Sequence, residues 1–226
     1  MSLIAKFFIL VIAPILAMLL ALLGVETLPT NPLGWFLLLV GVVYIAGVVI
    51  VYVIRRERFW ESPLNGSPIL EEHGDRSLWF ITLGMLAAFY LSPIDYIYLP
   101  ACLPRNAWMS FSGVGLVALG IVQFVWARRV LGTNYSGHVS VKVGHSLVQN
   151  GPYHFIRHPA YLGYLLMALG IGLGYSSLAG LASTFLLLLP SLIYRIKVEE
   201  KLLFRYFGES YRQYAIVVKR LIPCIW

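Results

Sequence analysis

The chain is organised around one polar stretch, residues 144–163, which reads GHSLVQNGPYHFIRHPAYLG. This stretch holds three of the five histidines in a chain of 226 residues, 59% of which are hydrophobic. Pro159 is predicted to be the first residue of the helix that follows, because a proline there gives up only an N–H that would lack a partner and brings a helical φ. Arg157 and His158 would then lie directly before a membrane helix.

The residues around Pro159 predict a site for an anion. An exposed helix start presents free backbone N–H groups and a partial positive charge, and Arg157 and His158 beside it would attract a carboxylate or a phosphate. A basic anchor at the membrane surface explains the same two residues equally well. Tyr153 and Tyr161 add ring surfaces for a planar ligand, although aromatic residues are also common where helices meet the interface.

Composition identifies a polytopic membrane protein. The mean hydropathy is +0.80 and only 12% of the residues are charged, so a soluble globule of this length could not bury its apolar surface. No cleavage pattern follows residues 3–23, which we therefore expect to be the first transmembrane helix. The net charge of +7 could indicate nucleic acid, but the basic residues gather at predicted helix ends without a nucleic-acid motif. We expect no nucleic-acid partner.

Apolar runs predict about six spans. Runs at 3–24, 33–54, 77–98 and 107–127 each have roughly the 20 residues needed to cross a bilayer. Two further runs, 160–174 and 178–194, are so close that they must form a helical hairpin, and the second continues without a breaker into residues 192–207. The glycines of 160–174 predict close helix packing.

The Lys and Arg residues predict the orientation. With a cytoplasmic N-terminus, every one of them except Arg105 falls at or inside the inner surface. Both termini are then cytoplasmic, and Cys102 and Cys224 lie on opposite sides of the membrane, where they cannot pair. The fold class is all-α: a polytopic transmembrane helical bundle with a cytoplasmic C-terminal helical tail. We divide it into N-terminal transmembrane helices, 1–127, and a catalytic region, 128–226.

The helix that ends the last span supplies the second half of the predicted site. Arg195 and Glu199 are spaced i, i+4 and share a face, which is also the spacing of a plain intrahelical salt bridge. If this face turns toward 144–161, it offers an Arg fork for a carboxylate and a Glu for a cationic amine or a ribose hydroxyl. Gly208 is predicted to end the helix.

Two other polar features have simpler explanations. Asp95 lies near the outer end of the third span, and although an ionisable residue at membrane depth is a candidate functional residue, we expect a structural role beside its neighbouring proline and tyrosines. His154 and His158 lie close in sequence, but Pro159 interrupts the helix that would align them. We therefore expect no metal centre.

Taken together, these motifs resemble the isoprenylcysteine carboxyl methyltransferases and related integral-membrane methyltransferases. The resemblance covers roughly 128–226, and no single motif would suffice for it. The matching residues are Leu131-Gly132-Thr133-Asn134-Tyr135-Ser136-Gly137-His138-Val139, His145-Ser146-Leu147-Val148, Gly151-Pro152-Tyr153, Arg157-His158-Pro159-Ala160-Tyr161-Leu162-Gly163, Glu199-Glu200 and Phe207-Gly208-Glu209-Ser210-Tyr211.

The resemblance implies an enzyme that uses S-adenosyl-L-methionine and takes a lipophilic or lipidated substrate, such as a prenylcysteine, from the surrounding membrane lipids. Arg195 would meet the substrate carboxylate. Lys142 is the candidate for a further polar cofactor contact, in a segment several residues shorter than in the eukaryotic enzymes. The residues that would line the cofactor pocket are His145, Ser146, Leu147, Val148, Tyr153, His158, Pro159, Ala160, Tyr161 and Glu199.

The chemistry of carboxylate methylation is consistent with a methyltransferase, but the sequence leaves other functions open. A carboxylate is already ionised near neutral pH, so its methylation needs no general base, and positioning can supply most of the rate. Related phospholipid N-methyltransferases act on an amine, beside which Arg195 would have the wrong charge. Membrane sterol reductases that use NADPH share the Arg-His-Pro motif and a C-terminal Arg-x-x-Pro. A non-enzymatic membrane scaffold is the remaining alternative.

Overall fold

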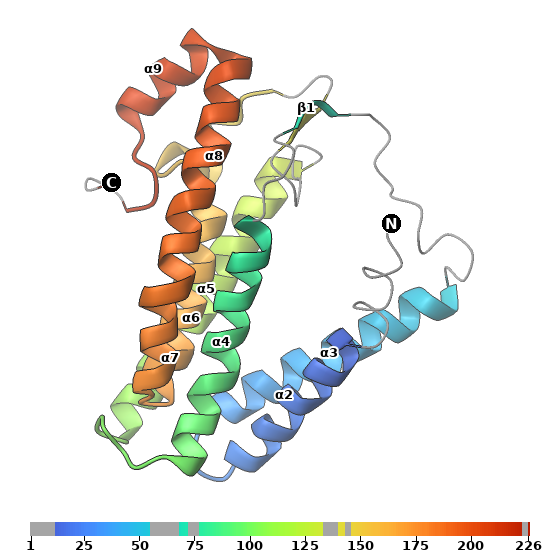
Figure 1. Cartoon of the computed structure of the whole chain (residues 1–226), viewed down its shortest axis with the longest axis vertical. Coiled ribbons are helices and arrows are strands. Elements are labelled where there is room, and N and C mark those ends of the chain that lie inside the picture. The colour runs from blue at the N-terminus through green and yellow to red at the C-terminus, as the bar shows by residue number, and fades with distance from the viewer. Residues whose placement is uncertain (1–11, 55–67, 72–76, 133–139, 143–145, 223–225) are drawn as a thin grey trace.

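The computed structural model describes residues 12–54, 68–71, 77–132, 140–142, 146–222 and 226. Figure 1 shows a group of long helices side by side, with α2 and α3 leaning away from it. The elements in chain order are α2 (Ala13–Thr27), α3 (Leu33–Ile54), β1 (Pro68–Glu71), α4 (Ser77–Tyr98), α5 (Ala107–Leu131), β2 (Ser140–Lys142), the 3-10 helix η3 (Gly151–His154), α6 (Pro159–Gly174), α7 (Leu178–Ser183), the π-helix η4 (Thr184–Leu188), α8 (Leu189–Phe207) and α9 (Glu209–Val217).

Apolar helices make this an integral membrane protein. Within the described ranges, three helices are long and apolar enough to cross a membrane: Ser77–Tyr98, Ala107–Leu131 and the continuous helix Leu178–Phe207. Three shorter apolar helices, Ile15–Thr27, Leu33–Val43 and Pro159–Gly174, accompany them. All six coincide with predicted apolar runs, and six spans stay a prediction. The chain before residue 12, where the first run begins, lies outside the described residues.

The end of the last span differs from the sequence-based expectation of an uninterrupted helix. One π-helical segment, Thr184–Leu188, separates α7 from α8. Pro190 lies at the start of α8. Proline has no N–H for the bond to the carbonyl four residues back, and its ring crowds that carbonyl, so the helix widens locally instead of ending.

A short sheet is the one departure from the all-helical prediction among the described residues. Strands β1 and β2 pair antiparallel, with Glu71 opposite Ser140 and Leu70 opposite Val141, and the register shifts between Pro68 and Leu70. The strands belong to two connections that lie far apart in sequence. They join the loop before α4 to the loop after α5 at one end of the bundle (Figure 1).

Glycines allow α5 and α6 to pack closely, as the sequence predicts. A Cβ built on Gly113 would lie 2.4 Å from the Cα of Gly174, and one on Gly163 would lie 2.8 Å from the carbonyl oxygen of Gly120. Without side chains at these positions, the two backbones approach to a distance that larger residues would prevent. This contact places the start of α6 beside the end of α5.

Hydrogen bonds of polar side chains hold the opposite end of the bundle together, where the chain passes from α6 to α7. The Oδ2 atom of Asp95 accepts hydrogen bonds from the Ser177 hydroxyl at 2.6 Å and from the Ala179 N–H at 3.1 Å. The Asn31 amide donates to the Gly174 carbonyl at 2.8 Å. Asp95 thus has the structural role that the sequence predicts, because its carboxylate ties α4 to the hairpin.

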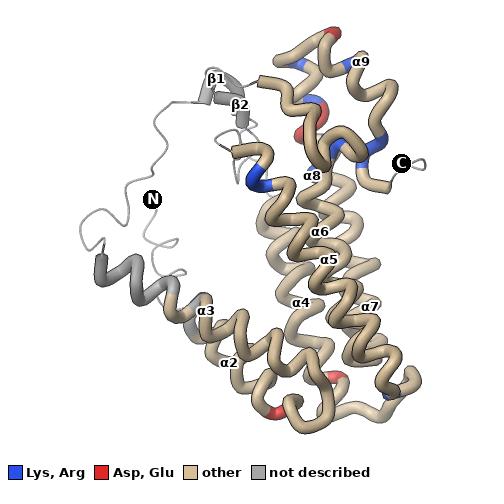
Figure 2. The backbone as a smooth tube through the Cα atoms, turned by 180° about the vertical axis from the view of Figure 1, so that it is seen from behind, with Lys and Arg blue, Asp and Glu red and all other residues tan. Residues whose placement is uncertain are grey.

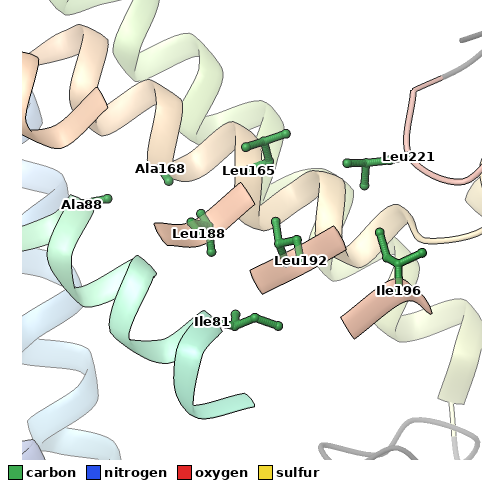
Figure 3. Packing of buried hydrophobic residues seen from close by; sticks show 8 residues of the cluster. All are labelled: Ile81, Ala88, Leu165, Ala168, Leu188, Leu192, Ile196 and Leu221. Carbon is green, nitrogen blue, oxygen red and sulfur yellow. The ribbon is translucent and has the colours of Figure 1, made fainter. Parts of the chain in front are cut away.

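The main apolar core lies between α4, α6 and the helix formed by η4 and α8, and Figure 3 shows its side chains meeting from these elements. The last described segment of the chain also contributes to it. Burial of these side chains fixes the face that α8 turns toward α6, and so the direction of the polar residues further along α8. The core residues are Ile81, Ala88, Leu165, Ala168, Leu188, Leu192, Ile196 and Leu221.

Candidate active site

The polar stretch before α6 is held by the end of the chain. Ile156 forms a parallel bridge with Lys219, the Arg157 N–H donates to the Lys219 carbonyl at 2.8 Å, and the His158 N–H donates to the Arg220 carbonyl at 2.9 Å. Helix α6 begins at Pro159, as predicted. These bonds place Arg157 and His158 between α6 and α8, at the end of the bundle where most of the blue segments in Figure 2 gather.

A tyrosine hydroxyl links two predicted site residues. Tyr161 on α6 donates to the Glu199 carboxylate at 2.6 Å and accepts a bond from Arg195 Nε at 3.2 Å. Arg195 is only 4% exposed, and its Nη1 donates to Ser77 Oγ of α4 at 3.0 Å. The spacing of Arg195 and Glu199 on one helix face therefore serves a chain of contacts that connects α4, α8 and α6.

His158 extends this group of side chains. Its ring stacks on the Tyr161 ring with centroids 5.5 Å apart and an interplanar angle of 14°. Its Nδ1 lies 3.7 Å from Glu199 Oε2, and its Nε2 lies 3.5 Å from Glu200 Oε1. The imidazole thus lies between the carboxylates of Glu199 and Glu200, which have different environments.

Glu200 is the buried member of this pair. Its Oε1 lies 2.9 Å from Arg157 Nη2 and its Oε2 lies 2.8 Å from Arg220 Nε, and only 4% of its side chain is exposed. The Arg157 side chain is 7% exposed. Glu200 is therefore the anion that the structure places beside Arg157 and His158, and the binding of an anionic ligand there stays a prediction.

A second cluster on α9 supports the polar stretch from the other side. Tyr214 donates to the Tyr153 carbonyl at 2.6 Å. Burial raises the pKa of the Tyr214 phenol to about 12, so this donor keeps its proton across the physiological range. Leu147 packs against the same cluster, and the Arg157 guanidinium lies 5.9 Å from the centre of the Tyr211 ring. Gly208, with φ of 55°, makes the predicted helix end that lets α9 fold back.

The predicted site residues fall into two groups and a remainder. His158, Tyr161, Arg195 and Glu199 meet directly, whereas Leu147 and Tyr153 belong to the α9 cluster. Pro159 is buried, Ala160 and Val148 are half-buried, and Ser146 is exposed. His145 lies outside the described residues, and Lys142 is placed only by its backbone in β2. No group of three His, Cys, Asp or Glu side chains in the described part of the chain is arranged to hold a metal ion.

Sequence reasoning missed Glu200, Arg220, Tyr214 and Ser77 as members of the site. One signal for Glu200 was present: Glu199 and Glu200 are the only acidic residues between 96 and 208, a range rich in Lys and Arg. An acidic residue in a segment with many Lys and Arg residues is expected to form ion pairs with several of them. Ser77 gives no such signal, because only the tertiary packing of α4 brings it to Arg195.

Comparison with known proteins identifies the same region. The family model described as phospholipid methyltransferase matches residues 108–210. The protein-S-isoprenylcysteine O-methyltransferase of Schizosaccharomyces pombe is 34% identical over 116 residues, and the match covers 50% of this chain and 49% of that protein. The enzyme of the same name from Xenopus laevis is 26% identical over 206 residues, which cover 90% of this chain and 68% of the relative. The chain thus matches about half to two thirds of these relatives.

A solved structure shares the fold. A eukaryotic intramembrane Ras methyltransferase, an isoprenylcysteine carboxyl methyltransferase, superposes with a TM-score of 0.61 at 22% sequence identity, over 92% of this chain and 74% of that one. Fold and site together define a helical membrane protein with a charged site at one end of its bundle. The chain is similar in sequence to isoprenylcysteine carboxyl methyltransferases and shares the fold of one of them.

Proposed function

We propose that this protein is an integral-membrane methyltransferase that transfers a methyl group from S-adenosyl-L-methionine to the carboxylate of a prenylcysteine-like lipid. The observation that carries the proposal is the Tyr161 hydroxyl, which bonds to Glu199 at 2.6 Å and to Arg195 at 3.2 Å. One side chain thus joins the residue expected to meet the cofactor to the residue expected to meet the substrate.

The residues beside Tyr161 fit a cofactor that carries a positive charge and a planar ring system. The Glu199 side chain is 32% exposed, so its carboxylate is open to a ligand, and the stacked rings of His158 and Tyr161 offer aromatic surface next to it. When bound, S-adenosyl-L-methionine supplies an electrophilic methyl group on a positively charged sulfur. Glu199 would stabilise that charge, and the rings would exclude water around it.

Arg195 fits a carboxylate acceptor. The residue is 4% exposed, and its guanidinium is oriented by Ser77 on one side and Tyr161 on the other. A guanidinium held in this way would orient a carboxylate and keep it ionised as the nucleophile, so positioning replaces a general base. An amine acceptor, as in phospholipid N-methylation, would have to lose a proton beside a fixed positive charge. Arg195 therefore favours the carboxylate over the amine.

We also propose six spans with both termini, the site and the α9 tail in the cytoplasm. The distribution of Lys and Arg supports this orientation. The substrate would then reach Arg195 sideways from the inner half of the bilayer.

Cofactor binding is tested by calorimetric titration of the detergent-purified protein with S-adenosylhomocysteine. We expect saturable binding by the wild type and binding at least about tenfold weaker for Glu199→Ala and His158→Ala, since each removes a contact to a charged ligand. NADPH serves as the comparison ligand. No binding of S-adenosylhomocysteine by folded protein, or binding of NADPH in its place, would overturn the proposal.

A further inference from the structure

A basic pocket lies on the side of the α8–α9 corner, apart from the residues assigned to cofactor and substrate. Its volume is about 420 Å³, within the range of ligand sites. Four cationic side chains line it, and none of the described residues that line it has an acidic side chain. The lining residues are Arg157, Phe204, Arg212, Ala215, Ile216, Lys219, Arg220 and Trp226.

The positive charge of this pocket exceeds what its neighbours neutralise. Glu200 pairs with Arg157 at 2.9 Å and with Arg220 at 2.8 Å, so one carboxylate serves two guanidinium groups. Arg212 lies 3.9 Å from Glu209, but these side chains are 70% and 66% exposed, and such a surface pair is weak. Lys219 adds a further cation. The surplus favours a ligand with a negative charge.

A buried donor without a partner points to the same ligand. Arg157 is 93% buried, as the complement of its 7% exposed side chain, and it lines the pocket. Its Nε–H has no hydrogen-bond partner among the described residues. A buried guanidinium N–H without an acceptor is costly, and an anion in the pocket would offer oxygen atoms close to it.

The surroundings of the pocket indicate that the anion belongs to a lipid. Ile216 is 72% exposed, Val217 is 79% exposed and Ile222 is 41% exposed, all close in sequence to Lys219. Apolar side chains beside a basic cluster at the end of a membrane bundle are typical of a segment that contacts the headgroup region, with the apolar side chains toward the acyl chains. A soluble phosphate would make no favourable contact with these apolar side chains.

We propose that this pocket binds the phosphate of an anionic phospholipid. Four cations, Arg157, Arg212, Lys219 and Arg220, would surround the phosphate, and Ile216 and Val217 would contact the part of the acyl chains nearest the headgroup. The lipid would hold α9 against the membrane surface. This site is independent of the proposed methyl transfer, because its residues differ from those assigned to cofactor and substrate.

Lipid retention tests the proposal. The protein is purified in detergent with an equimolar mixture of phosphatidylglycerol and phosphatidylcholine, and bound lipids are counted by native mass spectrometry. We expect the wild type to retain one phosphatidylglycerol in preference to phosphatidylcholine. The double variant Arg212→Gln/Lys219→Gln should retain it about tenfold less, because each cation near a lipid headgroup strengthens binding.

Matched controls make the result specific. Lys197→Gln/Lys201→Gln removes the same charge from exposed positions on α8 outside the pocket, and it should retain the lipid as the wild type does. Lys219→Arg keeps the charge and should also bind. Circular dichroism and thermal unfolding in detergent check that every variant is folded. Equal retention by the pocket variant and the wild type would overturn the proposal, as would displacement of the lipid by excess inorganic phosphate, which would identify a site for free phosphate.

Discussion

At the scale of single residues, two adjacent glutamates have different environments. Glu199 has 32% of its side chain exposed and contacts Tyr161, whereas Glu200 has 4% exposed and contacts Arg157 and Arg220. Neighbouring positions on a helix point about 100° apart, so consecutive residues can serve different partners. We infer that Glu199 serves the ligand and Glu200 holds the site together.

Glu200→Gln is expected to destabilise the protein by about 3 kcal/mol, because it leaves two buried or half-buried guanidinium groups without their carboxylate. Glu199→Gln is expected to change stability by less than about 1 kcal/mol, since its position is partly hydrated. Unfolding of both variants in detergent, followed by circular dichroism, measures the difference. Equal losses of stability would contradict this division of roles.

Tyr161→Phe tests the hydroxyl between Arg195 and Glu199. The ring stays in place to stack on His158, so only the two hydrogen bonds are lost. Hydrogen bonds to charged groups contribute about 1.5–3 kcal/mol, so we expect a loss of stability of at most about this size and a fall in kcat/KM for methyl transfer of about 10-fold to 100-fold. A variant with wild-type kinetics would show that the hydroxyl has no part in aligning the site.

The sequence could predict part of this site. Helical spacing predicted that Arg195 and Glu199 share a face, and the family resemblance named His158 and Tyr161, which the structure brings to the same place. Ser77 and Arg220 could not be found in this way, since they reach the site through the packing of α4 and through the bridge between Ile156 and Lys219. Such contacts between distant segments leave no local pattern in a single sequence.

At the scale of the elements, glycine determines how closely α5 and α6 approach. A Cβ on Gly113 would lie 2.4 Å from the Cα of Gly174 and 2.5 Å from the Gly170 carbonyl oxygen. Both contacts are to backbone atoms, which cannot move without shifting a helix. The position of α6, and with it the start of the site at Pro159, depends on this contact.

Gly113→Ala is therefore expected to destabilise the bundle by about 1–3 kcal/mol, the usual cost of overpacking. Gly115→Ala in the same helix is the matched control, because a Cβ there meets nothing within 4 Å. Alanine has the higher helix propensity, so this control should be neutral or slightly stabilising. Thermal unfolding in detergent compares the two, and an equal effect at both positions would contradict close packing at Gly113.

Helix bounds could be predicted more fully than helix irregularities. The predicted runs 33–54 and 77–98 coincide with α3 and α4, since hydropathy alone marks where an apolar helix begins and ends. The pairing of β1 with β2 and the π-helical segment before Pro190 were not predicted. The pairing joins distant loops, and proline permits either a helix end or a local widening, so packing decides between them.

At the scale of the whole molecule, the two ends of the bundle differ in their charged side chains. One end holds a cluster of charged side chains: Arg157, Arg195, Arg220, Glu199 and Glu200. The other end is held together by the hydrogen bonds of Asp95 and Asn31. This asymmetry follows the distribution of Lys and Arg along the chain. A site at the basic end is expected to face the cytoplasm.

Cysteine labelling tests this orientation. Cys102 is exposed in the connection between α4 and α5, at the end of the bundle opposite the site. In a Cys224→Ala variant, a membrane-impermeant maleimide added to intact cells should label Cys102. The converse variant, Cys102→Ala, should be labelled only after the membrane is opened. The reverse pattern would contradict cytoplasmic termini.

The most direct test of the central claim is transfer of a labelled methyl group from S-adenosyl-L-methionine to a prenylcysteine analogue, assayed as a base-labile methyl ester. We predict that wild-type protein in lipid vesicles forms this ester, that it forms none from the matching carboxamide, and that Arg195→Ala lowers kcat/KM by about 100-fold or more. Methylation of phosphatidylethanolamine instead, or no ester from folded protein that binds S-adenosylhomocysteine, would contradict a carboxylate acceptor.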